Sequence, residues 1–227
     1  MRLFKYVRAE RVDILENQRI AFTRPEEFND ALDTRPRVVP MTSLAVLKRK
    51  ARDEEAEVLK QMPPDFQALP RAERRRIGRE LLKGSIRDIR KNAEPIARKL
   101  QEDIYSGINS LFGVLCLTTN PNHRLMWGHY ADGDRGFVME FDTNKPRFAL
   151  SDGLHQIIYS NKPPTDDPAV ASQGWWKVKS KEWDYEDEYR IVSKLSECER
   201  KTIKDKTIYL RHLPRDCVKA VFMGLKM

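Results

Sequence analysis

Short apolar runs separated by turn residues recur along the chain, and this pattern predicts a set of short β-strands. Residues 112–117 and 137–141 are examples, because each run has the length of a strand and is bounded by turn-forming residues. Between them, apolar and aromatic residues at three- and four-residue spacing predict a short helix over residues 123–131. The other predicted elements are strands at residues 3–6, 19–22, 154–160, 189–192, 207–210 and 218–223, and a helix at residues 9–17.

From residue 42 to residue 106 the apolar periodicity becomes helical. Residues 44–59 indicate one helix, which ends before two consecutive prolines, and a second helix begins near Arg71. Pro95 is expected to kink or restart that second helix. The chain is therefore predicted to be a single α+β domain over residues 1–227. It would contain a mostly antiparallel sheet of about six to eight strands, split by a helical insertion at residues 42–106.

The composition excludes several classes of protein. The mean hydropathy of −0.66 is low, and no apolar run approaches the roughly 18 residues of a membrane span. The three cysteines, Cys116, Cys198 and Cys217, lack the spacing of a zinc site or a disulfide framework, which predicts a reduced, cytoplasmic compartment. The sequence also lacks a Walker loop, a Gly-x-Gly-x-x-Gly motif and a His-Glu-x-x-His motif, so P-loop, Rossmann and zincin functions are disfavoured.

The positive charge of the chain is concentrated in the predicted insertion. Residues 71–99 hold eleven basic and four acidic side chains, and this excess of seven is nearly the whole formal charge of +8. A basic helical face predicts contact with phosphate groups, and hence a nucleic-acid partner. The alternative is a solvated helix face, because no nucleic-acid fold signature accompanies the charge. The bases expected to contact nucleic acid are Arg71, Arg74, Arg75, Arg79, Lys83 and Arg87.

Two glutamates stand at the entrance of the strand predicted near residue 189. Strand alternation would place Glu186 and Glu188 on one face of the sheet, two residues apart. Like charges this close repel, so a cation or a hydroxyl-bearing substrate is expected between them. Arg190 is expected to form a bidentate pair with one of the nearby carboxylates. The alternative is a solvated, acid-lined edge strand.

Aromatic residues with polar tips gather on the helix predicted at residues 123–131. Trp127, His129 and Tyr130 lie within four positions of one another, and all four tryptophans fall between Trp127 and Trp183. This clustering favours an aromatic-walled cleft, and the alternative is a tryptophan-rich core. The loop at residues 23–30 is rich in acids and turn formers, which is typical both of functional loops and of plain turns.

Several short motifs together resemble a bacterial family of unknown function, DUF2971. These motifs are Leu-Phe-Lys-Tyr at 3–6, Phe-Asn-Asp at 28–30, Cys-Leu-Thr at 116–118, Met-Trp-Gly-His-Tyr-Ala-Asp-Gly-Asp-Arg-Gly at 126–136 and Trp-Asp-Tyr-Glu-Asp-Glu-Tyr-Arg at 183–190. The resemblance covers most of the chain outside residues 42–108. Members of that family usually continue past the strand that ends at Gly224, so the resemblance leaves open whether this chain is truncated at its C-terminus.

More distantly, the order of three motifs is similar to that of the ADP-ribosyltransferase superfamily. Such enzymes carry a polar residue beside a tyrosine or histidine on a first strand, a Ser/Thr strand or a Tyr in the middle, and a catalytic Glu on a late strand. The corresponding residues here are Lys5 and Tyr6, then Thr118 and Thr119 with Tyr130, then Glu186 and Glu188. Two departures stand out: Lys5 takes the place of His or Arg, and the Thr pair only approximates the middle motif.

This resemblance implies an ADP-ribosyltransferase-like fold and NAD as co-substrate. Glu188 would be the catalytic carboxylate, which stabilises the oxocarbenium-like centre as nicotinamide leaves, and Glu186 would orient the acceptor. His129 or Tyr130 would stack on nicotinamide. Lys5, Tyr6 and Thr118 would hold the ribose and phosphates. The acceptor would be a nucleic acid or a protein, and such an activity would suit a bacterial toxin or a phage-defence effector.

Two other functions stay open on sequence grounds. The domain could be a non-catalytic nucleic-acid-binding module that uses the basic helices. It could also be a metal-dependent nuclease using Asp30, Asp33, Glu186 and Glu188, although these acids lack the tight spacing of a metal site and no metal is predicted. A groove that joins Lys5, Tyr130 and Glu188 would favour the transferase.

Overall fold

The computed structural model describes residues 1–30, 33–35, 52–53, 60–144, 153–161, 174–203 and 205–227. Contacts divide the chain into two compact units. The first unit comprises Met1–Pro36, Ile104–Thr165 and Ala169–Met227, and the second comprises Arg37–Asp103 and Asp166–Pro168. No helix within the described ranges is both long enough and apolar enough to cross a membrane.

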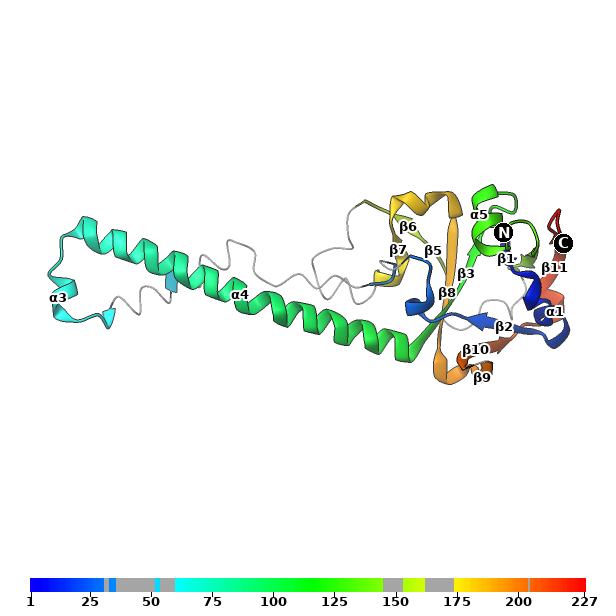
Figure 1. Cartoon of the computed structure of the whole chain (residues 1–227), viewed down its shortest axis with the longest axis horizontal. Coiled ribbons are helices and arrows are strands. Elements are labelled where there is room, and N and C mark those ends of the chain that lie inside the picture. The colour runs from blue at the N-terminus through cyan, green and yellow to red at the C-terminus, as the bar shows by residue number, and fades with distance from the viewer. Residues whose placement is uncertain (31–32, 36–51, 54–59, 145–152, 162–173, 204) are drawn as a thin grey trace. The chain divides into compact units, whose positions relative to one another are not determined.

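The first unit is built on a six-stranded antiparallel sheet (Figure 1). Its strands form at the short apolar runs of the sequence, where alternate side chains can enter the core. In spatial order they are β11 (Val218–Met223), β4 (Phe137–Asp142), β1 (Arg2–Val7), β3 (Phe112–Thr118), β8 (Glu188–Lys194) and β5 (Leu154–Gln156). Together with the helices, this sheet confirms the α+β class predicted from the sequence.

The sheet is split between β1 and β3. These two strands share a single register pair, Phe4 with Thr118, whereas β1 pairs with β4 along its full length and β3 does the same with β8. Across the split, the Lys5 ammonium donates a hydrogen bond of 3.2 Å to the Cys116 carbonyl. The sheet therefore opens where the two strands part, and polar side chains enter that opening.

The other strands of the described residues form two smaller sheets. A three-stranded antiparallel sheet joins β2 (Arg19–Phe22), β10 (Lys206–His212) and β9 (Glu199–Ile203), and a parallel pair joins β6 (Ile158–Tyr159) and β7 (Val178–Lys179). The shorter helices are η1 (Ala9–Arg11), α1 (Asp13–Asn17), η2 (Pro25–Glu27), α3 (Pro64–Gln67), α5 (Arg124–Tyr130), η3 (Trp175–Lys177), η4 (Lys181–Glu186), η5 (Leu195–Glu197) and η6 (Arg215–Cys217).

Strand alternation separates the two faces of the large sheet into different environments. The main core comprises Leu3, Val7, Ile14, Ile20, Phe22, Leu115, Leu117, Phe137, Met139, Phe141, Ile191, Leu213 and Cys217. A smaller core contains Phe4, Tyr6, Met126, Ala131 and Val138, with α5 contributing Met126. Register pairs Thr118 with Glu188 and Cys116 with Arg190, so these four side chains share the face that bears the smaller core.

Helix α4 (Arg71–Leu111) differs from the sequence prediction. It passes through Pro95 as one helix, so the predicted restart is wrong (Figure 1). The proline removes one intrahelical hydrogen bond, and the turns on either side of it hold the helix together. The helix also ends later than the predicted boundary at residue 106 and leads directly into β3 at Phe112. The helix predicted over residues 44–59 lies outside the described residues, apart from residues 52–53.

Most predicted strands are confirmed, with local differences. The strands predicted at 19–22 and 218–223 have the observed bounds of β2 and β11, and the helix predicted at 123–131 corresponds to α5. The single strand predicted at 154–160 is instead two short strands, β5 and β6. The helix predicted at 9–17 is divided into η1 and α1. Strands β7 and β9 were not predicted, because one is two residues long and the other is fully exposed and mostly polar.

Candidate functional site

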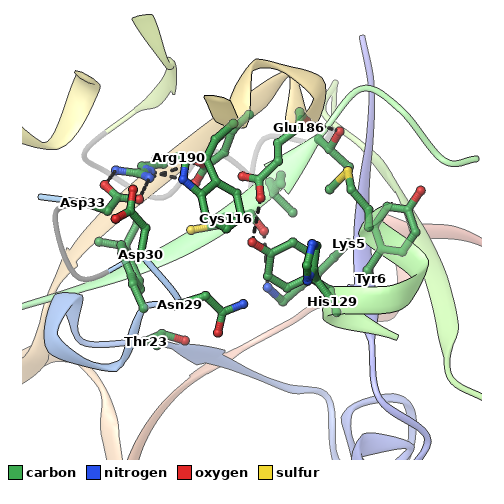
Figure 2. Close-up of a pocket in the computed structure, with 18 of the residues that line it drawn as sticks. Lys5, Tyr6, Thr23, Asn29, Asp30, Asp33, Cys116, His129, Glu186 and Arg190 are labelled. Atoms are coloured by element: carbon green, nitrogen blue, oxygen red, sulfur yellow. Dashed lines mark hydrogen bonds and ion pairs between the residues drawn. The ribbon is translucent and has the colours of Figure 1, made fainter. Parts of the chain in front are cut away.

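A pocket of about 240 Å³ opens at the split of the large sheet. Its walls come from β1, β3, the segment after β2, α5, β7, η4 and β8. Figure 2 shows Asn29, Asp30 and Asp33 on one side of it and Lys5 and His129 on the other. The pocket brings together all seven site residues predicted from the sequence, namely Lys5, Tyr6, Thr118, His129, Tyr130, Glu186 and Glu188.

Arg190 is the centre of a buried charge cluster beside this pocket. Its guanidinium is fully buried and makes two bidentate pairs. Nε and Nη2 donate to the Glu188 carboxylate at 2.7 and 3.0 Å, and Nη1 and Nη2 donate to the Asp33 carboxylate at 2.9 and 2.5 Å. The Phe28 ring lies 5.4 Å from the guanidinium carbon. The bidentate pair predicted for Arg190 is confirmed, and Asp33 supplies a second one.

Lys179, at the end of β7, is the cation between the two glutamates. Its Nζ lies 2.5 Å from Glu186 and 3.0 Å from Glu188, with Asp33 at 3.6 Å. The Trp183 ring lies 5.0 Å from the same ammonium. The sequence predicted a cation at this place, but nothing in the sequence around Lys179 marked it as that cation. Asp33 was named there only as a nuclease ligand.

The two glutamates converge by a different route from the one predicted. Strand β8 begins at Glu188, so Glu186 lies in η4, and Asp187 between them has a left-handed conformation with φ of 40°. The prediction that strand alternation places both glutamates on one sheet face is therefore wrong. Aspartate tolerates this backbone conformation better than most residues. The Thr118 hydroxyl fixes the turn by donating to the Glu186 carbonyl at 2.5 Å.

The two glutamates have opposite pKa shifts. Burial raises the pKa of Glu186, although Lys179 and the Tyr130 hydroxyl, which donates to Oε1 at 2.6 Å, oppose that rise. Burial alone would also raise the pKa of Glu188, but the charges of Arg190 and Lys179 outweigh it and lower the pKa to about 2. Neighbouring carboxylates with separated pKa values are typical of sites where one group stays ionised and the other exchanges a proton.

The low pKa of Glu188 predicts a specific loss of stability in acid. Because the folded state holds this carboxylate at a pKa of about 2 and its ordinary value is 4.5, its contribution is complete above about pH 5 and is lost as the pH falls toward 2. The loss is on the order of 3 kcal/mol. Urea unfolding between pH 6 and pH 2.5 measures it. Glu188→Gln should flatten that dependence, and an unchanged slope in this variant would contradict the assignment.

Lys5 is a pocket cation that lies outside the charge cluster. Within the described residues its ammonium makes no ion pair, and its hydrogen bond goes to the Cys116 carbonyl. Burial lowers the pKa of Lys5, because the charged form loses hydration there. A cation held in a pocket without a carboxylate partner favours an anionic ligand.

Aromatic rings line the pocket, and the hydroxyls of Tyr6 and Tyr130 already have hydrogen-bond partners within the protein. Tyr6 donates to the Asn120 carbonyl and accepts from the His123 amide, both at 3.0 Å, and burial raises the pKa of Tyr6 to about 12. His129 is exposed, and its ring centroid lies 6.1 Å from that of Trp183. The cleft therefore has an aromatic wall, with His129 as its exposed ring.

The acids of the pocket do not form a metal-binding arrangement. In the part of the chain that the structure describes, no group of three or more His, Cys, Asp or Glu residues is placed to hold a metal ion. Asp33, Glu186 and Glu188 do approach one another, but Arg190 and Lys179 fill the space between them. Two protein cations thus occupy the space where the nuclease hypothesis would place a metal.

Part of the chain matches a known protein family. Residues 126–191 match the model of a family described as a protein of unknown function, DUF2971, in agreement with the motifs of the sequence. The matched segment runs from α5 into β8 and includes Tyr130, Lys179, Glu186 and Glu188. No curated protein and no solved structure matches the chain.

Proposed function

We propose that the pocket is the active site of an NAD-dependent ADP-ribosyltransferase-like enzyme that modifies a nucleic-acid or protein acceptor. One observation carries the proposal: Lys5, Thr118 and Glu188 come from β1, β3 and β8, which are neighbours in the sheet, and all three line one pocket. These residues follow the order of the three ADP-ribosyltransferase motifs. Segments this distant in the sequence meet because β3 lies between β1 and β8 in the sheet.

Glu188 is suited to stabilise positive charge in the transition state. Its pKa of about 2 keeps it ionised at neutral pH. Arg190 and Lys179 occupy three of its acceptor positions, and a carboxylate offers about four. Glu188 therefore acts on the substrate mainly through its charge. A fixed anion in a water-poor pocket lowers the energy of the oxocarbenium-like ribose as the bond to nicotinamide breaks.

Glu186 is suited to the acceptor half of the reaction. Its raised pKa makes it a better proton acceptor than an ordinary carboxylate at neutral pH. In the proposed step, the glycosidic C1′–N bond breaks and its electron pair neutralises the pyridinium of leaving nicotinamide. The acceptor atom forms the new bond to C1′, and its proton passes to Glu186. Tyr130 and Lys179 hold the Glu186 carboxylate in place.

The size and walls of the pocket fit one end of a dinucleotide. A volume of about 240 Å³ lies below the roughly 300–1,000 Å³ of sites that enclose a whole drug-sized ligand. The nicotinamide riboside end would enter, and the remainder would extend outward. His129 offers a ring for stacking at the mouth. Lys5 offers the cation for the phosphates, and the engaged hydroxyls of Tyr6 and Thr118 position the walls.

The role of Lys5 gives a binding prediction. Lys5→Gln should weaken NAD binding about tenfold or more, because a charge-assisted hydrogen bond contributes about 1.5–3 kcal/mol. Isothermal titration calorimetry measures the change, with Lys201→Gln, an exposed lysine on β9, as the matched control. The control should bind like the wild type. Failure of the wild-type protein to bind NAD at about 1 mM, the upper range of ordinary substrate affinity, would rule out the proposed substrate.

A further inference from the structure

Helix α4 carries a regular row of basic side chains. Six of them recur at intervals of four residues over five consecutive steps, and we call this set the basic row: Arg71, Arg75, Arg79, Lys83, Arg87 and Lys91. All six are exposed. Residues four apart lie on one ridge of an α-helix. Each step rises about 6 Å and turns about 40° round the axis, so the row extends for about 30 Å and winds about 200° round the helix. No acidic residue interrupts it.

Few of these charges are balanced within the protein. Among the described residues, Lys83 alone of the six forms an ion pair, with Glu80 at 2.8 Å. Arg79 donates instead to the Arg75 carbonyl at 3.2 Å. Like charges at four-residue spacing repel and destabilise an isolated helix, so the regular spacing works against the helix by itself. A binding partner that supplies negative charge along the same line would relieve that repulsion.

We propose that the basic row binds the phosphate backbone of a nucleic acid. Arg79, Lys83, Arg87 and Lys91 share about 120° of the helix surface over about 18 Å, so one partner can reach these four. A backbone presents evenly spaced negative charges over such a length, which corresponds to about five base pairs of duplex. The described helix contributes no tryptophan and a single tyrosine, Tyr105, outside the row. Recognition therefore rests on phosphates and is independent of base sequence. This inference concerns the second unit and does not depend on the activity proposed for the pocket.

Salt dependence tests this proposal. Fluorescence anisotropy with a labelled 20-base-pair duplex of arbitrary sequence would give the binding constant between 50 and 200 mM salt. Four phosphate contacts predict a log–log slope of about −3.5 and a loss of affinity of about 10² over that range. Arg79→Gln with Arg87→Gln should reduce the magnitude of the slope by about 1.4–1.8, because each lost contact removes about 0.7–0.9. Glutamine keeps the helix, since its helix propensity is close to that of arginine.

The control removes a charge from the same helix on the side opposite Arg79 and Arg87. At about 100° per residue, Lys99 lies about 160° from the mean direction of those two arginines, so Lys99→Gln should leave the slope within about 0.3 of the wild type. An equal loss per removed charge in both variants would overturn the proposal in favour of diffuse net charge. Absence of duplex binding at 50 mM salt would overturn it as well. Binding to vesicles containing phosphatidylserine, with no binding to the duplex, would assign the row to a membrane surface instead.

Discussion

Replacing Arg190 with methionine is expected to lower the free energy of unfolding by about 3–5 kcal/mol. The guanidinium is fully buried and pairs with two carboxylates through four hydrogen bonds. Methionine fills a similar volume but leaves Asp33 and Glu188 buried with Lys179 as their remaining cation. Arg190→Lys should recover only part of the loss, because an ammonium cannot make two planar bidentate pairs. Urea unfolding at pH 7 measures both variants.

Arg2 provides the matched control for this prediction. It also forms a bidentate pair with a glutamate on the large sheet, Glu140, at 2.8 and 2.9 Å, but its side chain is 64% exposed. Arg2→Met should therefore cost under about 1 kcal/mol. Comparable losses for Arg2→Met and Arg190→Met would mean that burial of the charge cluster does not determine its contribution to stability.

The second large effect is expected at Glu188. Glu188→Gln removes the fixed negative charge and should lower the rate of nicotinamide release by about 10²–10³, the range found when a single stabilising group is lost from an active site. Binding of NAD should change little, because the carboxylate acts mainly as charge develops. Glu140→Gln is the control, since Glu140 is equally buried and Arg-paired but lies outside the pocket. Circular dichroism at the assay temperature would confirm that both variants are folded.

The local elements of this fold could be predicted because their signals are local. Apolar runs such as residues 112–117 marked the strands, since alternate positions of a strand must enter the core. The end of α4 was not predicted, and the sequence left open whether Pro95 would kink the helix or restart it. Proline usually interrupts a helix. The helix propensities of single residues do not show whether the turns on either side of a proline can continue the helix. A split sheet was predicted, but the position of the split between β1 and β3 was not. Pairing between strands that are distant in the sequence leaves no local signal.

The residues of the candidate site also divide into those with a local sequence signal and those without one. Lys5, Tyr130, Glu186 and Arg190 were found because they belong to dense motifs of charged and aromatic residues. Lys179 was missed because a two-residue parallel strand brings it to the glutamates, and such a pairing leaves no periodic pattern. The position of Glu186 outside the strand depends on one left-handed aspartate, a conformation that aspartate permits but does not require.

The most direct test of the proposed function is release of nicotinamide from NAD by the purified protein, followed by chromatography in the presence and absence of nucleic-acid and protein acceptors. The proposal predicts release by the wild-type protein and by Glu140→Gln. It predicts a rate about 10²–10³ lower for Glu188→Gln and, with the correct acceptor, a mass increase of one ADP-ribose unit on that acceptor. Nicotinamide release that is equal for the wild type and Glu188→Gln would contradict the proposed function. Release that is absent from a wild-type protein that also fails to bind NAD would contradict it too.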